Sequence, residues 1–269
     1  MANTGDGRTA LVTGASAGIG QAFAEVLASE GFALVLTARR GDRLEDLATT
    51  LRARHGVAVH VIADDLADPQ AATRIEAALA AHGLRVDLLV NNAGYGVPGA
   101  FLRSPWADHA RFMQVMMTAV CDLTYRLLPG MIERGWGRVI NVASVAGLVP
   151  SPAGHTMYGA SKAFLIRFSE ALHAESRSRG VHVTAVCPGF THTEFHDVLG
   201  TRDQMKGLPA FLWLDAAGVA REGYQAVTRG EAVWVNGWIY RRLVWLAAVA
   251  PAGLLGWVTG RAGRSYRKT

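Results

Sequence analysis

The stretch ALVTGASAGIGQAFAEVLASEG, residues 10–31, decides the fold. A short apolar run meets a glycine cluster, and an amphipathic helical pattern follows at once and closes at Gly31. A strand, a glycine turn and a helix in this order aim backbone N–H groups and the positive helix end at a pyrophosphate. An ordinary βα turn rich in small residues is the alternative. We expect a dinucleotide-binding turn with contacts at Gly14, Ser16, Gly18, Ile19 and Gly20.

The end of the next apolar run bears on the choice of cofactor. Residues 33–38, ALVLTA, read as a buried strand, and Arg39 and Arg40 follow it. An acidic residue near this point suits the ribose 2′-hydroxyl of NAD, whereas an arginine suits a 2′-phosphate. The two arginines favour NADP(H) over NAD(H), and the alternative is that both are solvated residues at a helix start.

Strand and helix patterns then alternate with short loops and no linker. This alternation predicts an α/β fold, a single doubly wound parallel sheet with helices on both faces. The expected helices are residues 43–54, 71–82, a long one over 108–134 bent or ended near Pro129, and 158–179; the expected strands are residues 58–62, 88–91, 138–142, 181–186 and a last one at 232–235.

Residues 144–162, SVAGLVPSPAGHTMYGASK, carry the candidate chemistry. Tyr158 and Lys162 are four residues apart, so they share one face of a helix, and the ammonium favours the ionised phenol by lowering its pKa. The phenol then exchanges protons near neutral pH while Ser144 holds the oxygen that receives them. The alternative is that YGASK only opens an amphipathic helix.

With these residues the chain resembles the classical short-chain dehydrogenase/reductase family over about residues 8–190. The resemblance rests on five motifs in order: TGASAGIG at residues 13–20, NNAG at residues 91–94, Ser144, the YxxxK pair, and Pro188-Gly189 followed by Thr193. It implies a Rossmann-type fold and hydride transfer between a nicotinamide and a carbonyl or secondary alcohol.

The resemblance also implies roles for individual residues. Tyr158 would be the general acid, Ser144 would orient the substrate oxygen, and Lys162 would bind the nicotinamide ribose and lower the pKa of the tyrosine. Asp65 would contact the adenine, and Arg39 with Arg40 the 2′-phosphate. The other expected cofactor contacts are Leu66, Asn92, Ala93, Gly94, Pro188, Gly189 and Thr193.

Two departures from the family pattern stand out. Counting back from Leu123-Thr124, the relay asparagine of the family falls on Met116, and a thioether is only a weak acceptor and cannot donate. This departure motivates a second hypothesis, an NADP(H)-binding regulatory or scaffold protein with little catalysis. The segment between Ser144 and Tyr158 is one residue longer than usual and contains His155, a candidate substrate contact or a solvated loop residue.

The stretch at residues 190–215 is where the family places its substrate lid. Phe190, Phe195 and Trp213 supply aromatic surface for a lipophilic small molecule. A place in the core or in a subunit contact is the alternative for these side chains.

The C-terminal segment, residues 237–269, differs most from the family. Its apolar run at residues 243–258 contains Pro251 and two glycines and is shorter than the about 20 residues of a spanning helix, so we exclude a transmembrane span. We expect an extension of helical character on the catalytic domain of residues 1–236, packed on that domain or on a partner subunit in preference to a membrane surface.

Charge and cysteine content argue against a nucleic-acid-binding protein, a disulfide-stabilised protein and a metalloprotein. The net charge is +5, with eight basic and two acidic residues from Ala216 onward, so the basic excess lies at the C-terminus and a nucleic-acid partner is not expected. Cys121 and Cys187 form no CxxC motif and have no histidine at ligand spacing, so neither a disulfide framework nor a metal site is predicted. No secretory signal is visible.

We expect a cytoplasmic homo-oligomer, a dimer or tetramer. Peripheral membrane association through the C-terminal segment is the alternative for its surroundings.

Overall fold

The computed structural model describes residues 5, 7–97, 99–151, 154, 156–194 and 209–250. His155, Phe195 and the C-terminal residues 251–269 lie outside these ranges. All of the strands expected from the sequence, including the last one, lie within them.

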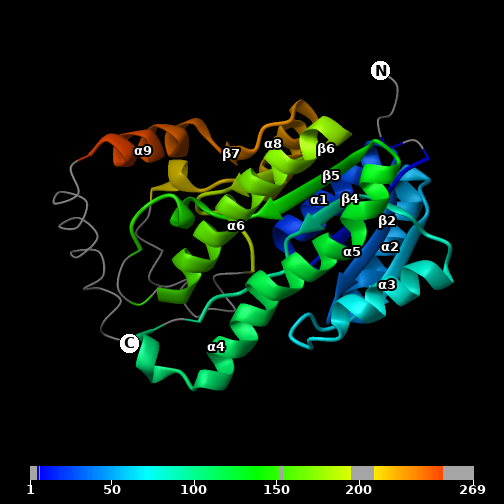
Figure 1. Cartoon of the computed structure of the whole chain (residues 1–269), viewed down its shortest axis with the longest axis horizontal. Helices are drawn as coiled ribbons and strands as arrows, with labels where there is room; N and C mark the ends of the chain where they lie inside the picture. The colour runs from blue at the N-terminus through cyan, green and yellow to red at the C-terminus, as the bar shows by residue number, and fades with distance from the viewer. Residues whose placement is uncertain are drawn as a thin grey trace.

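One parallel sheet of seven strands organises the described chain (Figure 1). Its order is β3-β2-β1-β4-β5-β6-β7, which reverses direction between β1 and β4. In open α/β sheets ligands bind at such a switch point, outside the carboxyl ends of the strands. The expected α/β fold is confirmed, with strands β1 Thr9–Thr13, β2 Ala33–Ala38, β3 Val59–Ala63, β4 Val86–Asn91, β5 Gly137–Val142, β6 Val181–Cys187 and β7 Val233–Val235.

Helices cover both faces of the sheet because successive residues of each central strand point to opposite sides. Ala10 and Val12 of β1 join the core under one set of helices, whereas Leu11 joins the core under the other. The first set is α1 Gly18–Ser29, α2 Gly41–His55 and α8 Ala216–Arg229, and the second is α3 Ala71–Ala81, α5 Ala119–Glu133 and α6 Thr156–Ser176. Short 3₁₀ turns lie at Phe101–Arg103, Val145–Gly147, Arg177–Arg179 and Ala210–Leu212.

The long helix expected over residues 108–134 is irregular at a different place from the one predicted. It begins as α4 Trp106–Met113, passes through a π-helical turn at Gln114–Thr118 and continues as α5. Pro129 lies inside α5, which runs one further turn to Glu133. The irregularity therefore falls beside the candidate site, which is where π-turns often occur.

This helical stretch, Trp106–Glu133, is long and apolar enough to cross a membrane by length and composition alone. Val115, Ala119 and Leu123 are nevertheless buried in the core between it and the sheet. Such packing is that of a core helix.

Helix α9, Trp238–Val249, follows β7 and lies at the opposite end of the molecule from α3 (Figure 1). Tyr240 is its buried residue. Five large apolar side chains of the same helix are exposed, namely Trp238, Leu243, Trp245, Leu246 and Val249. The sequence predicted a helical extension here, and of that extension the structure describes α9.

Candidate active site

The glycine turn after β1 is shaped by close backbone contacts. Gly14 and Gly18 have φ of +65° and +57°, a left-handed conformation that favours glycine. A Cβ atom at Gly14 would lie 2.8 Å from Cα of Ala93, and one at Gly18 would lie 3.0 Å from Cβ of Thr193. The turn therefore brings together three segments that the sequence predicted as cofactor contacts.

The NNAG segment is fixed to this turn by hydrogen bonds. The side-chain amide of Asn92 donates to the carbonyls of Thr13 and Gly14 at 2.9 and 3.2 Å. The Thr13 hydroxyl oxygen accepts from the backbone N–H groups of Asn92 and Ala93 at 2.9 and 3.0 Å. These bonds satisfy groups at the ends of β1 and β4, so the switch point is held rigidly.

Ser144, Tyr158 and Lys162 meet at the carboxyl end of β5. Ser144 caps the turn Val145–Gly147, where its Oγ accepts from the N–H of Ala146 at 3.1 Å and donates to the carbonyl of Pro188 at 3.4 Å. Tyr158 and Lys162 lie in the first two turns of α6, and the Lys162 Nζ is 5.6 Å from the centroid of the Tyr158 ring. A hydrogen bond joins the Ser144 and Tyr158 side chains. The three groups predicted from the sequence are thus brought together.

The protonation of this group differs from the prediction. Burial raises the pKa of Tyr158 to about 12, and the hydrogen bond between the Tyr158 and Ser144 side chains lowers it only in part. Burial also lowers the pKa of Lys162 to about 8, and its Nζ donates at 2.7 Å to the carbonyl of Val142. The predicted direction of the shift in the tyrosine pKa is wrong for this structure, because desolvation of the phenol outweighs the effect of an ammonium group that is bonded to the Val142 carbonyl. Tyr158 is therefore a neutral proton donor at pH 7.

Two arginines lie at the open side of the glycine turn. Arg40 donates from Nε and Nη2 to the Ser16 hydroxyl at 3.3 and 3.1 Å. Arg40 and Arg43 both pair with Glu194, at 3.2 and 2.9 Å. Arg43 was missed by the sequence analysis, although its place in the first turn of α2, after the β2 strand, was a usable signal. Arg39 is exposed beside them.

The structure describes the predicted adenine contacts and two of the four predicted substrate contacts. Asp65 follows β3, where its Oδ1 accepts from the N–H of Ala67 at 3.0 Å, and Leu66 beside it is buried. On the substrate side, Phe190 and Trp213 approach with ring centroids 5.9 Å apart, and His192 stacks on Trp213 at 4.7 Å. The two predicted contacts His155 and Phe195 lie outside the described residues.

Comparison with known proteins shows which family has this fold and this set of motifs. The family model for short chain dehydrogenase matches residues 8–204 of the chain. The chain belongs to the short-chain dehydrogenase family. It is therefore an oxidoreductase that acts on CH–OH or C=O groups with a nicotinamide cofactor.

Three similar proteins include a 3-oxoacyl-CoA reductase, a short-chain dehydrogenase solved with NADPH and an alcohol dehydrogenase specific for ketones. Human very-long-chain 3-oxoacyl-CoA reductase is 33% identical over 253 residues, which is 89% of this chain and 79% of that protein. A short-chain dehydrogenase from Sphingobium yanoikuyae, solved in complex with NADPH, has 31% identity and a TM-score of 0.79 over 91% of this chain and 97% of that one. The bulky-bulky ketone specific alcohol dehydrogenase from Comamonas testosteroni has 31% identity and a TM-score of 0.75, over 89% and 90% of the two chains.

Met116 is the main departure of this dehydrogenase from the family pattern. It lies in the π-helical turn, is 1% exposed, and its sulfur would be 3.0 Å from a Cβ atom at Gly94. The thioether thus fills the space behind the NNAG segment with an apolar group. A direct proton path through this side chain is absent because sulfur in a thioether cannot donate.

Tyr240 of α9 is a site residue that the sequence analysis missed. Its ring lies so close to Gly189 that a Cβ atom there would overlap it. Its hydroxyl accepts from the N–H of Phe190 at 3.0 Å and donates to the carbonyl of Leu212 at 2.6 Å. The C-terminal helix of the dehydrogenase thus fixes the chain just after the Pro188-Gly189 motif. A tyrosine in a segment without family motifs gave no signal for this role.

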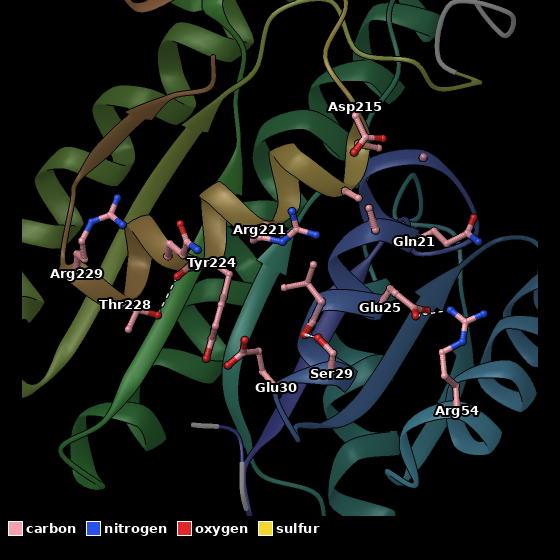
Figure 2. A pocket seen from close by; sticks show the side chains of 16 residues that line it. Gln21, Glu25, Ser29, Glu30, Arg54, Asp215, Arg221, Tyr224, Thr228 and Arg229 are labelled. Atoms are coloured by element: carbon pink, nitrogen blue, oxygen red, sulfur yellow. Dashed lines mark hydrogen bonds and ion pairs between the residues drawn. The ribbon is translucent and has the colours of Figure 1, made fainter. Parts of the chain in front are cut away.

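The larger of the two described cavities, about 910 Å³, follows the outer side of α1 and is not lined by Ser144, Tyr158 or Lys162. Figure 2 shows Glu25 and Arg54, joined by an ion pair, on one side of it and Arg221 and Tyr224 of α8 on the other. A second cavity of about 350 Å³ is lined by Ser16, Arg43 and Glu194 and shares Glu25 and Arg54 with the first. The second cavity is the one at the cofactor turn.

Proposed function

We propose that this protein is an NADPH-dependent reductase of ketones that carry bulky apolar groups, 3-oxoacyl thioesters among them. The observation that carries the proposal is the placement of Ser144, Tyr158 and Lys162 at the carboxyl end of β5, in the same fold as a glycine turn bordered by arginines. A neutral Tyr158 with a raised pKa supports the reductive direction because it holds the proton that an alkoxide needs.

The cofactor turn fits a dinucleotide with a 2′-phosphate. The glycines leave backbone exposed where side chains would collide, which suits close approach of a pyrophosphate. Arg40 and Arg43 bind the carboxylate of Glu194, and Arg40 also holds the Ser16 hydroxyl, so an anion lies in the place where a ribose phosphate would be held. Charge-assisted bonds from guanidinium groups favour a phosphate monoester over a neutral hydroxyl.

In the proposed reduction a bound nicotinamide cofactor supplies the hydride and side chains of the protein supply the proton. Tyr158 donates its phenolic proton to the carbonyl oxygen as that oxygen becomes an alkoxide, and Ser144 donates a hydrogen bond that orients the same oxygen. Lys162 is charged below its pKa of about 8, and its ammonium stabilises the phenolate left on Tyr158 until a proton returns from solvent.

The substrate class is supported by relatives and by the aromatic residues near the site. Both a very-long-chain 3-oxoacyl-CoA reductase and a dehydrogenase of bulky ketones match most of the chain. Phe190 and Trp213 place aromatic surface next to the Pro188-Gly189 motif. Burial of apolar substrate groups on such surface contributes about 25 cal/mol per Å².

Turnover assays test the substrate proposal. We expect NADPH oxidation with 3-oxoacyl-CoA substrates, with kcat/KM rising from short to long acyl chains, and Tyr158→Phe should lose nearly all turnover while binding NADPH normally. Single-turnover measurements also test the regulatory alternative, since robust oxidation excludes it. Equal kcat/KM for short and long chains would overturn the apolar-substrate proposal, and unchanged turnover in Tyr158→Phe would overturn the mechanism.

Binding assays test the cofactor proposal separately. Arg40→Ala and Arg39→Ala should each weaken NADPH much more than NADH, because only NADPH carries the phosphate. Equal weakening of both cofactors would contradict the preference. Arg40→Lys serves as a control that keeps the charge but loses the forked geometry of the guanidinium.

Surface properties of α9 support a peripheral contact with an anionic membrane. The exposed apolar residues Trp238, Trp245 and Leu246 lie on the same helix as the exposed Arg241 and Arg242, a combination that suits the headgroup boundary. Co-sedimentation with anionic liposomes should fall sharply in the double variant Trp245→Ser, Leu246→Ser. Equal sedimentation of variant and parent would dismiss this contact and leave a second subunit as the partner of the helix.

A further inference from the structure

Glu194 occupies the anion subsite at the cofactor turn. Its carboxylate receives two bonds from Arg43 Nη1, at 2.9 and 3.1 Å, and one from Arg40 Nη1 at 3.2 Å. Arg40 at the same time holds the Ser16 hydroxyl. The acid is 154 residues from Arg40 in the sequence, so this contact joins the end of the β6 loop to the start of α2.

The position of Glu194 is fixed by its neighbour in the chain. Thr193 lies against Gly18 of the glycine turn, so that a Cβ on Gly18 would be 3.0 Å from its side chain. Arg43 and Arg40 hold the pKa of the Glu194 carboxyl below its ordinary value, so the group is ionised at pH 7. A full negative charge therefore lies between the two guanidinium groups.

We infer that Glu194 is an internal competitor of the cofactor's 2′-phosphate for Arg40 and Arg43, and that it limits the preference of this enzyme for NADPH. A phosphate monoester needs the same guanidinium hydrogens that the carboxylate now accepts, so it binds there by displacing the acid. NADH has no group for this subsite and leaves the ion pairs intact. The inference rests on the proposed NADPH dependence and adds a residue that opposes it.

The expected size of the effect follows from exposure. The side chains of Arg40, Arg43 and Glu194 are 43%, 45% and 48% exposed, so their ion pairs are screened by solvent. Exposed pairs of this kind correspond to a displacement penalty of about threefold to tenfold in affinity. The adjoining cavity of about 350 Å³ gives the released carboxylate room to turn away.

The test measures binding of adenosine 2′,5′-bisphosphate and of AMP, which differ in the 2′-phosphate, by titration calorimetry. Glu194→Gln should bind the bisphosphate about threefold to tenfold more tightly than the parent and leave AMP unchanged. Glu170→Gln, which removes a glutamate from an exposed pair with Arg167 on α6, is the matched control and should change neither. In the background Arg43→Ala the gain from Glu194→Gln should shrink.

The outcomes separate the two claims. Unchanged or weaker bisphosphate binding by Glu194→Gln overturns the competition, because it shows that the acid is neutral toward the phosphate or supports the arginines. Equal affinity of the parent for the two ligands overturns the NADPH preference instead. If the parent binds the bisphosphate and AMP equally but Glu194→Gln binds the bisphosphate more tightly, Glu194 does compete with the 2′-phosphate. The parent enzyme then has no preference for NADPH.

Discussion

The Tyr240 ring lies directly on Gly189, and its hydroxyl joins the N–H of Phe190 to the carbonyl of Leu212. This contact ties α9 to both flanks of the stretch that the sequence predicted as the substrate lid. A residue in the C-terminal segment thereby acts as a positioning residue for the loop that follows β6. The C-terminal segment is thus in direct contact with the candidate active site.

We expect Tyr240→Phe to keep the ring contact and lose both hydrogen bonds. Leaving the half-buried N–H and carbonyl groups without this partner costs at most about 1–3 kcal/mol, so the loop should loosen and KM for the ketone should rise while the Kd of NADPH changes little. Tyr125→Phe is the control, because the Tyr125 side chain is 80% exposed. Unchanged KM would show that the hydroxyl only supports the fold.

Met116 gives a second prediction because an apolar group fills the position of the family's relay asparagine. Met116→Asn should raise kcat severalfold by restoring a donor and acceptor in the π-helical turn that packs against α6, and it should lower the melting temperature because an amide is buried in place of a thioether. Met116→Leu serves as the control that stays apolar, and its kcat should match the parent. A lower kcat in Met116→Asn than in Met116→Leu would contradict a relay role for this position.

A buried polar chain behind the active site predicts a stability effect. Asn141 donates from Nδ2 to the Ser169 hydroxyl at 2.8 Å, accepts from Asn91 Nδ2 at 2.9 Å, and is itself fully buried. Ser169→Ala leaves the Asn141 donor unpaired, which costs about 1–3 kcal/mol in the free energy of unfolding.

Denaturant unfolding of Ser169→Ala measures that cost. Ser29→Ala removes a comparable hydroxyl-to-carbonyl bond from an exposed helix position, so it should change stability by less than about 0.5 kcal/mol. Equal effects of the two substitutions would show that the Asn141 amide finds another partner.

Residues with local signals were predictable from the sequence, and those fixed by distant contacts were not. The glycine turn and the alternation of strands and helices along the chain follow from patterns within about 20 residues, so β1 and α1 fall where expected. The pairing of Glu194 with Arg43 joins residues 151 apart, and the tyrosine pKa depends on how completely the fold excludes water. Neither the distant contact nor the burial is encoded by local spacing.

The pKa of Lys162 gives a prediction for the pH dependence of reduction. Burial lowers this pKa to about 8, so the ammonium is present below pH 8 and is lost as pH rises through that value. Tyr158, with a pKa raised to about 12, keeps its proton over the same range. The reductive kcat/KM should therefore be flat from pH 6 to about 7.5 and decline above about pH 8, as the phenolate loses its stabilising charge.

Lys162→Arg separates this cause from general alkaline damage. A guanidinium stays charged to above about pH 12, so whatever activity the variant retains should show no decline near pH 8. The same decline in parent and variant would assign it to another group. A parent profile flat to pH 10 would show instead that Lys162 keeps an ordinary pKa, and that its bond to the Val142 carbonyl compensates for burial.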